Sequence, residues 1–263
     1  MKIAVFVKHV PDVAEADLEV AADGRTVKGG ELPFEMNEWD RFALEEAVLV
    51  KDSLGGELTS FLIGDEAAEE SLRRCLAVGA DRAVRVWDDG LAGANPFALT
   101  AAMRGAIGED EYDLILCGAQ SSDDGYGLGG PLLAEALGVP SVALVNKMKV
   151  EGGKVLVTRE LEGGWGEEVE VDLPALVTIQ TGINEPRYVS ILGIKKARKK
   201  PIDLMDAVSV GITAERLATE KEKLSLVGIE TPAVGEGAEI LEGSPEEVAA
   251  KCLALLKEAG GVL

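Results

Sequence analysis

The chain has 263 residues, 47% of them hydrophobic, and a formal net charge of −21 at pH 7. This size suits one large globular domain, or one domain with an appendage. The negative charge disfavours nonspecific binding to nucleic acid or to an anionic membrane, and no apolar run is long enough to predict a membrane-inserted helix.

The first 145 residues alternate short apolar runs with helical patterns. Residues 3–7 form an apolar run that Lys8 ends, which is too short for a secretory signal and typical of a buried first strand. From Trp39 to Val50, apolar residues recur at helical spacing. This alternation predicts a right-handed α/β fold on a parallel sheet. Further strands are expected at 58–63, 83–87, 114–117 and 141–145.

After Asn146 the apolar residues alternate with a period of two. Val155 and Val157 follow the pair Gly152-Gly153, which suits a tight hairpin turn. We therefore predict an antiparallel hairpin or meander, after which residues 175–179 return to the main sheet.

Capping residues mark two helix starts. Asn95 and Pro96 predict a helix over 97–107, because asparagine caps a helix and proline fits its first turn. The sequence Ser244-Pro245-Glu246-Glu247 supplies a cap, a first-turn proline and a capping-box glutamate for a C-terminal helix. We expect that helix, at the end of a polar arm, to dock either on its own domain or on another protein.

The cysteines and the single histidine restrict the chemistry. Cys75, Cys117 and Cys252 lie far apart in apolar segments, which predicts structural thiols in a reducing, cytoplasmic compartment. With His9 as the only histidine, neither a zinc site nor a serine triad is expected.

A glycine-rich loop over residues 118–130 follows a predicted central strand and leads into a helix, where open α/β sheets bind ligands. Its glycines let backbone N–H groups approach a phosphate, beside a helix N-terminus. Ser121 and Ser122 can donate hydrogen bonds, and Asp123 or Asp124 can hold a ribose hydroxyl. Because the loop matches neither the Walker pattern nor the dinucleotide fingerprint, a purely structural loop remains the competing interpretation.

Two other segments bear on function. Residues 36–40 precede the first long helix, with Asn37 as its candidate cap, and are expected to line the same crevice as residues 8–12. Residues 187–200 hold six basic side chains and no acidic one, with apolar residues between them. An apolar tip flanked by lysines suits docking on an acidic protein surface, whereas the overall charge argues against RNA binding.

Three segments together resemble the β subunit of electron transfer flavoproteins, and the resemblance extends from Lys2 to about Ile202. The segments that carry it are residues 5–8, residues 118–130, and Asn184-Glu185-Pro186-Arg187-Tyr188 with its lysine-rich tail.

The resemblance implies an adenine-nucleotide-binding α/β domain over 1–186, a basic recognition loop over 187–200, and a C-terminal arm over 201–263 that docks on a partner subunit. It also implies an electron carrier rather than an enzyme. Such a β subunit pairs with an α subunit that holds most of the FAD, and it buries an AMP of its own. Electrons pass from flavin-dependent dehydrogenases to this FAD and on to a membrane-bound quinone oxidoreductase.

Site residues are implied by the same resemblance. Val13 and Trp39 are expected to face the flavin, and Ile191 to be the apolar anchor of the recognition loop. The basic flank of that loop comprises Lys195, Lys196, Arg198, Lys199 and Lys200. The positions expected to contact AMP are Phe6, Asn37, Glu38, Trp39, Asp40, Ile63, Gly118, Ala119, Gln120, Ser121, Ser122, Asp123, Asp124, Gly125, Tyr126, Gly127, Leu128 and Gly129.

The chain departs from the family pattern in the glycine loop. Ala119 replaces a lysine, Ser121-Ser122 replace Ala-Ile, and Gly127-Leu128-Gly129 replace Gln-Thr-Gly, so phosphate contacts are expected to depend on backbone groups and serine hydroxyls. A bifurcating branch of the family carries a second FAD in place of AMP and has a Gly-Ser-Asp-Thr run where this chain has residues 92–95, so AMP is favoured. The alternative from another class is a free-standing adenine-nucleotide hydrolase or stress-type ATP-binding protein.

Overall fold

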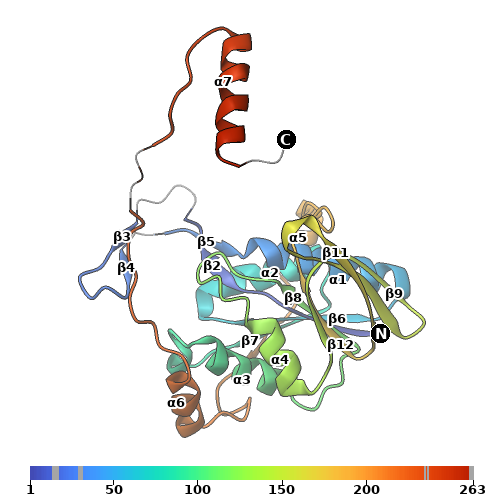
Figure 1. The fold of residues 1–263 in the computed structure, drawn as a ribbon. Coiled ribbons are helices and arrows are strands. Elements are labelled where there is room, and N and C mark those ends of the chain that lie inside the picture. The colour runs from blue at the N-terminus through green and yellow to red at the C-terminus, as the bar shows by residue number, and fades with distance from the viewer. Residues whose placement is uncertain (14–17, 29–31, 234, 236, 261–263) are drawn as a thin grey trace.

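A nine-stranded sheet forms the centre of the computed structural model, which describes residues 1–13, 18–28, 32–233, 235 and 237–260 (Figure 1). Its strands are β1 (Lys2–Phe6), β6 (Glu57–Ile63), β7 (Arg82–Val86), β8 (Leu114–Gly118), β9 (Ser141–Glu151), β10 (Lys154–Glu160), β11 (Gly166–Asp172), β12 (Ala175–Ile179) and β13 (Asp203–Met205). They lie in the order β11-β10-β9-β12-β8-β1-β6-β7-β13. In this spatial order, all neighbours in the run β9-β12-β8-β1-β6-β7-β13 pair in parallel, whereas β10 pairs antiparallel with both β9 and β11. The predicted α/β fold with an antiparallel hairpin is therefore confirmed.

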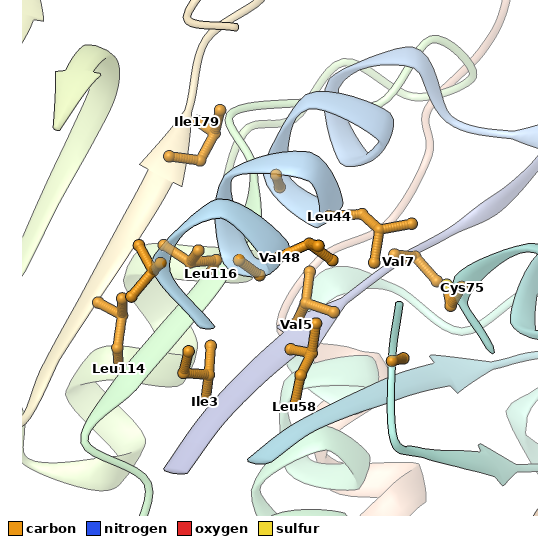
Figure 2. Close-up of a cluster of buried hydrophobic side chains, with 14 of the residues drawn as sticks. Ile3, Val5, Val7, Leu44, Val48, Leu58, Cys75, Leu114, Leu116 and Ile179 are labelled. Carbon is orange, nitrogen blue, oxygen red and sulfur yellow. The ribbon is translucent and has the colours of Figure 1, made fainter. Parts of the chain in front are cut away.

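Helices cover both faces of the parallel strands. The helices α1 (Glu38–Leu54) and α2 (Glu69–Val78) pack on one face, and α3 (Pro96–Ile107) and α4 (Gly129–Leu137) pack on the other. The side chains of β1 alternate between the two cores, as the period of a strand requires. Ile3 and Val5 face Leu44 and Val48 of α1 (Figure 2), whereas Phe6 belongs to the core beneath α3 and α4.

The antiparallel part of the sheet, formed by β9, β10 and β11, begins within β9 and not after a separate strand. The sequence predicts a strand over 141–145 followed by a separate hairpin, but β9 is one continuous strand that serves both parts of the sheet. It contains Leu144 at a φ of 61°, and the register shifts beside this residue. Gly152 and Gly153 have φ values of 61° and 81°, so the predicted glycine turn is confirmed. Val155 and Val157 bring the extension into the core that α1 covers.

Small elements fill the connections. Among the described residues before α1, β2 (His9–Pro11) pairs with β5 (Phe34–Met36), and β3 (Glu19–Val20) pairs with β4 (Val27–Lys28), both antiparallel. Short 3-10 helices occupy Glu66–Ala68, Asp89–Leu91 and Glu162–Gly164, and α5 (Ile191–Ala197) follows β12.

The C-terminal part leaves the domain stepwise. The helix α6 (Ala214–Glu222) packs on α3, and a long arm then leads to α7 (Pro245–Glu258), which stands apart from the sheet in Figure 1. The predicted capping box of Ser244 and Glu247 is confirmed. No residue of α7 is buried, although Val248, Cys252, Leu255 and Leu256 form an apolar stripe along it. Within the described residues, no helix is long and apolar enough to cross a membrane.

Candidate nucleotide-binding crevice

A crevice opens where two neighbouring parallel strands send their connections to opposite faces of the sheet. The chain leaves β1 for α1 on one face and leaves β8 for α4 on the other, while β1 and β8 pair directly. In open α/β sheets, ligands bind at the carboxyl ends of such strands. A cavity lies at this point, between the end of β1, the N-terminus of α1, the side of α3 and the glycine loop.

The inner part of the cavity is apolar. Its walls include Phe6 and Ile63 from the strands, Leu99 and Met103 from α3, and Leu133 from α4. Phe6 is held by stacking on Phe61, with the ring centroids 4.9 Å apart. An apolar slot with polar groups at its rim is the arrangement that suits a planar heterocycle carrying a polar tail.

The first turn of α1 ties the glycine loop to the end of β1. Asn37 donates to the carbonyl of Gln120 over 2.9 Å and accepts from the N–H of Ser122 over 3.2 Å. Asn37 therefore occupies the N-cap position but makes no side-chain cap bond, so its predicted capping role is wrong. Asp40 accepts from the backbone N–H groups of Lys8 and Gly118, each over 2.8 Å. Burial raises the pKa of the Asp40 carboxyl to about 6.

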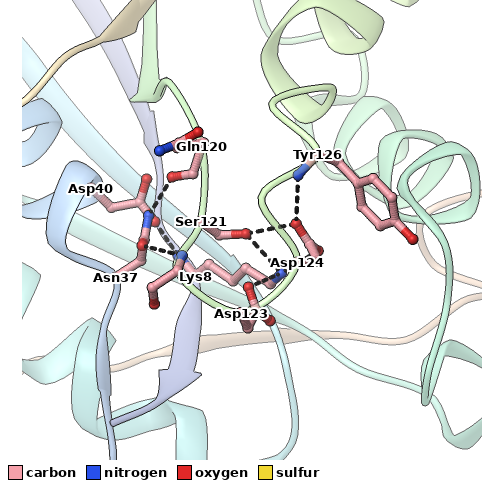
Figure 3. A network of polar contacts seen from close by, with 9 residues as sticks. Lys8, Asn37, Asp40, Gln120, Ser121, Asp123, Asp124 and Tyr126 are labelled. Carbon is pink, nitrogen blue, oxygen red and sulfur yellow. Dashed lines mark hydrogen bonds and ion pairs between the residues drawn. The ribbon is translucent and has the colours of Figure 1, made fainter. Parts of the chain in front are cut away.

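An ion-pair cluster stands at the mouth of the crevice (Figure 3). The ammonium of Lys8 lies 2.7 Å from a carboxylate oxygen of Asp123, 2.7 Å from one of Asp124, and 3.2 Å from the Ser121 hydroxyl. Burial opposes the charge of Lys8, but the two carboxylates outweigh it and raise the lysine pKa. Burial is also the largest single influence on Asp123 and opposes its ionisation, but the hydrogen bond and charge of Lys8, together with bonds from Ser121 and the backbone of Asp124, outweigh burial and lower the pKa of that carboxyl.

Two glycines in this region are required by packing. A Cβ on Gly118 would lie 2.5 Å from Asp40 Oδ1, and a Cβ on Gly130 would lie 2.4 Å from Thr178 Cγ2. At Gly125 and Gly127, φ values of 62° explain glycine by backbone conformation instead. Some of the glycines in the loop are thus required by the fold, as the interpretation of a purely structural loop expects. Their close packing brings the N-terminus of α4 near the ends of β8 and β12.

The structure gathers most of the AMP positions that the resemblance implies. Those that line the cavity are Phe6, Asn37, Asp40, Ile63, Gly118, Ala119, Gln120, Ser121, Asp124, Tyr126, Gly127, Leu128 and Gly129. Those outside its lining are Glu38, Trp39, Ser122, Asp123 and Gly125.

The two residues expected to face the flavin also lie outside the cavity lining. The indole N–H of Trp39 donates to Gln180 over 2.8 Å, and Val13 is exposed.

The sequence did not predict that α3 forms one wall of the cavity. Leu99 and Met103 line the cavity, yet they belong to no motif, and Pro96 lines it although the sequence marks it only as a first-turn proline. The three residues share a spacing of three and four positions, which places them on one side of a helix. That spacing is equally typical of ordinary core residues, so it identifies no binding site without the sheet order.

The basic segment forms a short helix as well as a loop. Ser190 caps α5 by accepting from the N–H of Gly193 over 3.0 Å, and Ile191 is 76% exposed. The side chains of Lys195, Lys196, Arg198 and Lys199 are exposed. Lys200 differs, because its ammonium donates to the carbonyl of Ala80 over 2.7 Å. This bond holds the end of the basic segment against the domain.

The Asn184–Arg187 motif anchors this segment to α1. Asn184 donates to the carbonyl of Phe42 and to the carboxylate of Glu46. Arg187 forms an ion pair of 2.9 Å with Glu45, whose side chain is only 5% exposed, and a second pair with Asp52. The motif therefore fixes the base from which Ile191 projects.

Comparison with known proteins places the chain. Residues 26–210 match the family model described as the electron transfer flavoprotein domain. The electron transfer flavoprotein subunit beta of Methylophilus methylotrophus is 38% identical over 265 residues, covering 99% of this chain and 100% of that protein. The subunit beta of Bacillus subtilis is 31% identical over 100% of both chains. The Caffeyl-CoA reductase-Etf complex subunit CarD of Acetobacterium woodii is 33% identical over 98% of both. These matches confirm the resemblance inferred from the sequence, and the chain belongs to the electron transfer flavoprotein family.

Proposed function

We propose that the chain is the β subunit of a heterodimeric electron transfer flavoprotein that binds AMP in the crevice between β1 and β8. The observation that carries the proposal is the apolar cavity at the point where the connections of these strands diverge, in a member of this family. The FAD, held mainly by the α subunit, supplies the electron-accepting ring. The chain itself contributes binding and docking surfaces, and it carries electrons without being an enzyme.

AMP is favoured over a second FAD by a double cap at the start of α3. The side-chain oxygen of Asn95 accepts from the N–H of Ala98 over 3.0 Å. Its amide nitrogen donates to the carbonyls of Glu220, Lys221 and Leu224, over 3.1, 2.9 and 3.0 Å. These bonds hold the end of α6 against the start of α3, next to Pro96 in the cavity wall. The bifurcating branch has a Gly-Ser-Asp-Thr run where this chain has residues 92–95, and the use of Asn95 in this double cap fits a β subunit that departs from that branch.

The nucleotide content of the purified complex tests this proposal. The chain is produced together with its α subunit, the complex is denatured, and released FAD and AMP are quantified. Equal amounts of FAD and AMP are expected. Two FAD per heterodimer and no AMP would favour the bifurcating alternative. No flavin and no stable partner would favour the adenine-nucleotide hydrolase.

Two exposed surfaces support docking on partners. The apolar stripe of α7 is uncovered within the described residues, so we assign the arm to the α subunit. The exposed basic residues at the end of α5 and just after it follow the exposed apolar side chains of Ile191 and Leu192, and this segment suits the acidic surface of a flavin-dependent dehydrogenase. A quinone oxidoreductase is the proposed acceptor of the electrons. No binding to nucleic acid and no insertion into a membrane is proposed.

Replacing Ile191 with alanine is expected to lower kcat/KM for electron transfer from the dehydrogenase by about tenfold, the effect of truncating an interface hot spot. FAD content should not change, because Ile191 is 76% exposed in the chain itself. Val208→Ala is a matched control, since Val208 is 80% exposed on the loop after β13. Loss of flavin from the Ile191 variant would instead assign this residue to the stability of the complex.

A further inference from the structure

The charges around the crevice are unusual for a site that takes a phosphate. Among the described residues that line the cavity, Lys8 is the only lysine or arginine, and Asp40 and Asp124 are the carboxylates. Asp123 also pairs with Lys8 from just outside the lining. One cation therefore faces three carboxylates, and its ammonium is already shared between two of them.

The acidic side chains at the mouth are fixed in place. Asp124 accepts from Lys8, from the Ser121 hydroxyl over 2.8 Å and from the N–H of Tyr126 over 3.2 Å. Asp123 and Asp124 keep side-chain exposures of only 27% and 33%. Asp124 thus cannot turn away from an incoming anion without breaking three hydrogen bonds, and Asp123 would lose its pair with Lys8. The partial burial of both carboxylates limits screening by salt.

The remaining attraction for a phosphate is short in range. The backbone N–H groups at the start of α4, a nine-residue helix, offer partial positive charge at the cavity edge. That attraction falls off within the first helical turn, so it can offset the negative cluster for a single phosphate group. A second or third phosphate adds charge without an additional cation to meet it.

We propose that Lys8, Asp123 and Asp124 act together as a charge filter, which admits a nucleoside monophosphate and disfavours nucleotides with longer phosphate chains. The inference rests on the proposed AMP site and names the residues that determine its specificity. The two aspartates are specificity-determining residues, because their net excess of negative charge over Lys8 repels further phosphates. Lys8 keeps that excess small enough for the first phosphate to enter.

The test compares AMP, ADP and ATP binding to the full chain in buffer with EDTA, so that no metal ion neutralises the phosphates. Binding is measured by calorimetric titration after removal of bound nucleotide, and thermal unfolding monitors the fold of each variant. Wild-type protein is expected to bind ATP at least about tenfold more weakly than AMP. A factor of this size corresponds to repulsion between one added phosphate charge and the net negative charge of the aspartates at a distance of several ångströms. In Asp123→Asn/Asp124→Asn, the difference should shrink to about threefold or less.

Two further variants sharpen the result. Lys8→Met should weaken AMP by about tenfold while leaving adenosine nearly unchanged, because the carboxylates then lack their counter-charge. Glu66→Gln is the control, since Glu66 is an exposed carboxylate outside the cavity lining, and it should keep the wild-type ratio. A folded double-asparagine variant that retains the wild-type preference would overturn the filter but leave AMP binding intact. If the wild-type chain binds no adenine nucleotide, the proposed AMP site fails and the filter with it.

Discussion

Replacing Arg187 with glutamine is expected to lower the free energy of unfolding by about 2–3 kcal/mol, because Glu45 is then left as a buried carboxylate without a cation. The expected loss is smaller than for a fully buried pair, since the Arg187 side chain is 36% exposed. Urea unfolding of the purified chain measures it, as a shift of the midpoint at constant slope. Docking of the dehydrogenase should weaken as well, because Arg187 holds the base of α5.

A double variant separates the ion pair from other effects. Glu45→Gln/Arg187→Gln removes both charges but keeps an acceptor for the backbone N–H of Arg187, which bonds Glu45 over 3.0 Å. It should therefore be more stable than the single Arg187 variant. Arg82→Gln is the matched control, because Arg82 and Asp203 are both 50% exposed, and its cost should stay below about 0.5 kcal/mol. Equal losses in the single and double variants would contradict the ion-pair explanation.

Replacing Gly130 with alanine is expected to cost about 2–3 kcal/mol of stability and to reduce AMP retention, because overpacking forces α4 away from the sheet. The added Cβ would lie 2.4 Å from Thr178 Cγ2 and 2.9 Å from Cys117 Sγ, both on strands of the parallel sheet. The start of α4 lines the cavity, so its displacement should change nucleotide binding as well as unfolding.

The neighbouring glycine provides the control in the same helix. A Cβ on Gly129 would meet only Met103 Cε at 4.0 Å, so Gly129→Ala should change stability by less than about 1 kcal/mol. Urea unfolding and the AMP content of the purified complex measure both variants. If the two alanine variants behave alike, close packing at Gly130 is not the reason for glycine there.

The succession of strands and helices along the chain was largely predictable, because each element depends on residues that are neighbours in the sequence. Alternating apolar runs predicted the parallel strands, and the caps at Asn95 and Ser244 marked helix starts that the structure confirms. The edge strand β13 and the helix α6 were missed. Their residues are largely exposed, so they lack the apolar periodicity on which such predictions depend.

The candidate site likewise has a part that the sequence predicts and a part that it does not. The glycine loop could be predicted from its composition and its place after an apolar strand, whereas α3 contributes a cavity wall through residues that look like ordinary core. Asn37 shows why local rules fail there. Its sequence position is that of a cap, but the folded loop offers it Gln120 and Ser122, and these long-range partners replace the cap bond.

The α/β class, the family resemblance, the glycine loop and the basic segment could all be inferred without a structure, since each is a property of contiguous residues. Folding instead brings Lys8 to Asp123, 115 positions away, and Arg187 to Glu45, 142 positions away. Such contacts depend on which strands lie side by side and on which face each connection takes. Local periodicity does not encode that choice, because it reports the burial of a segment and not the identity of its neighbours.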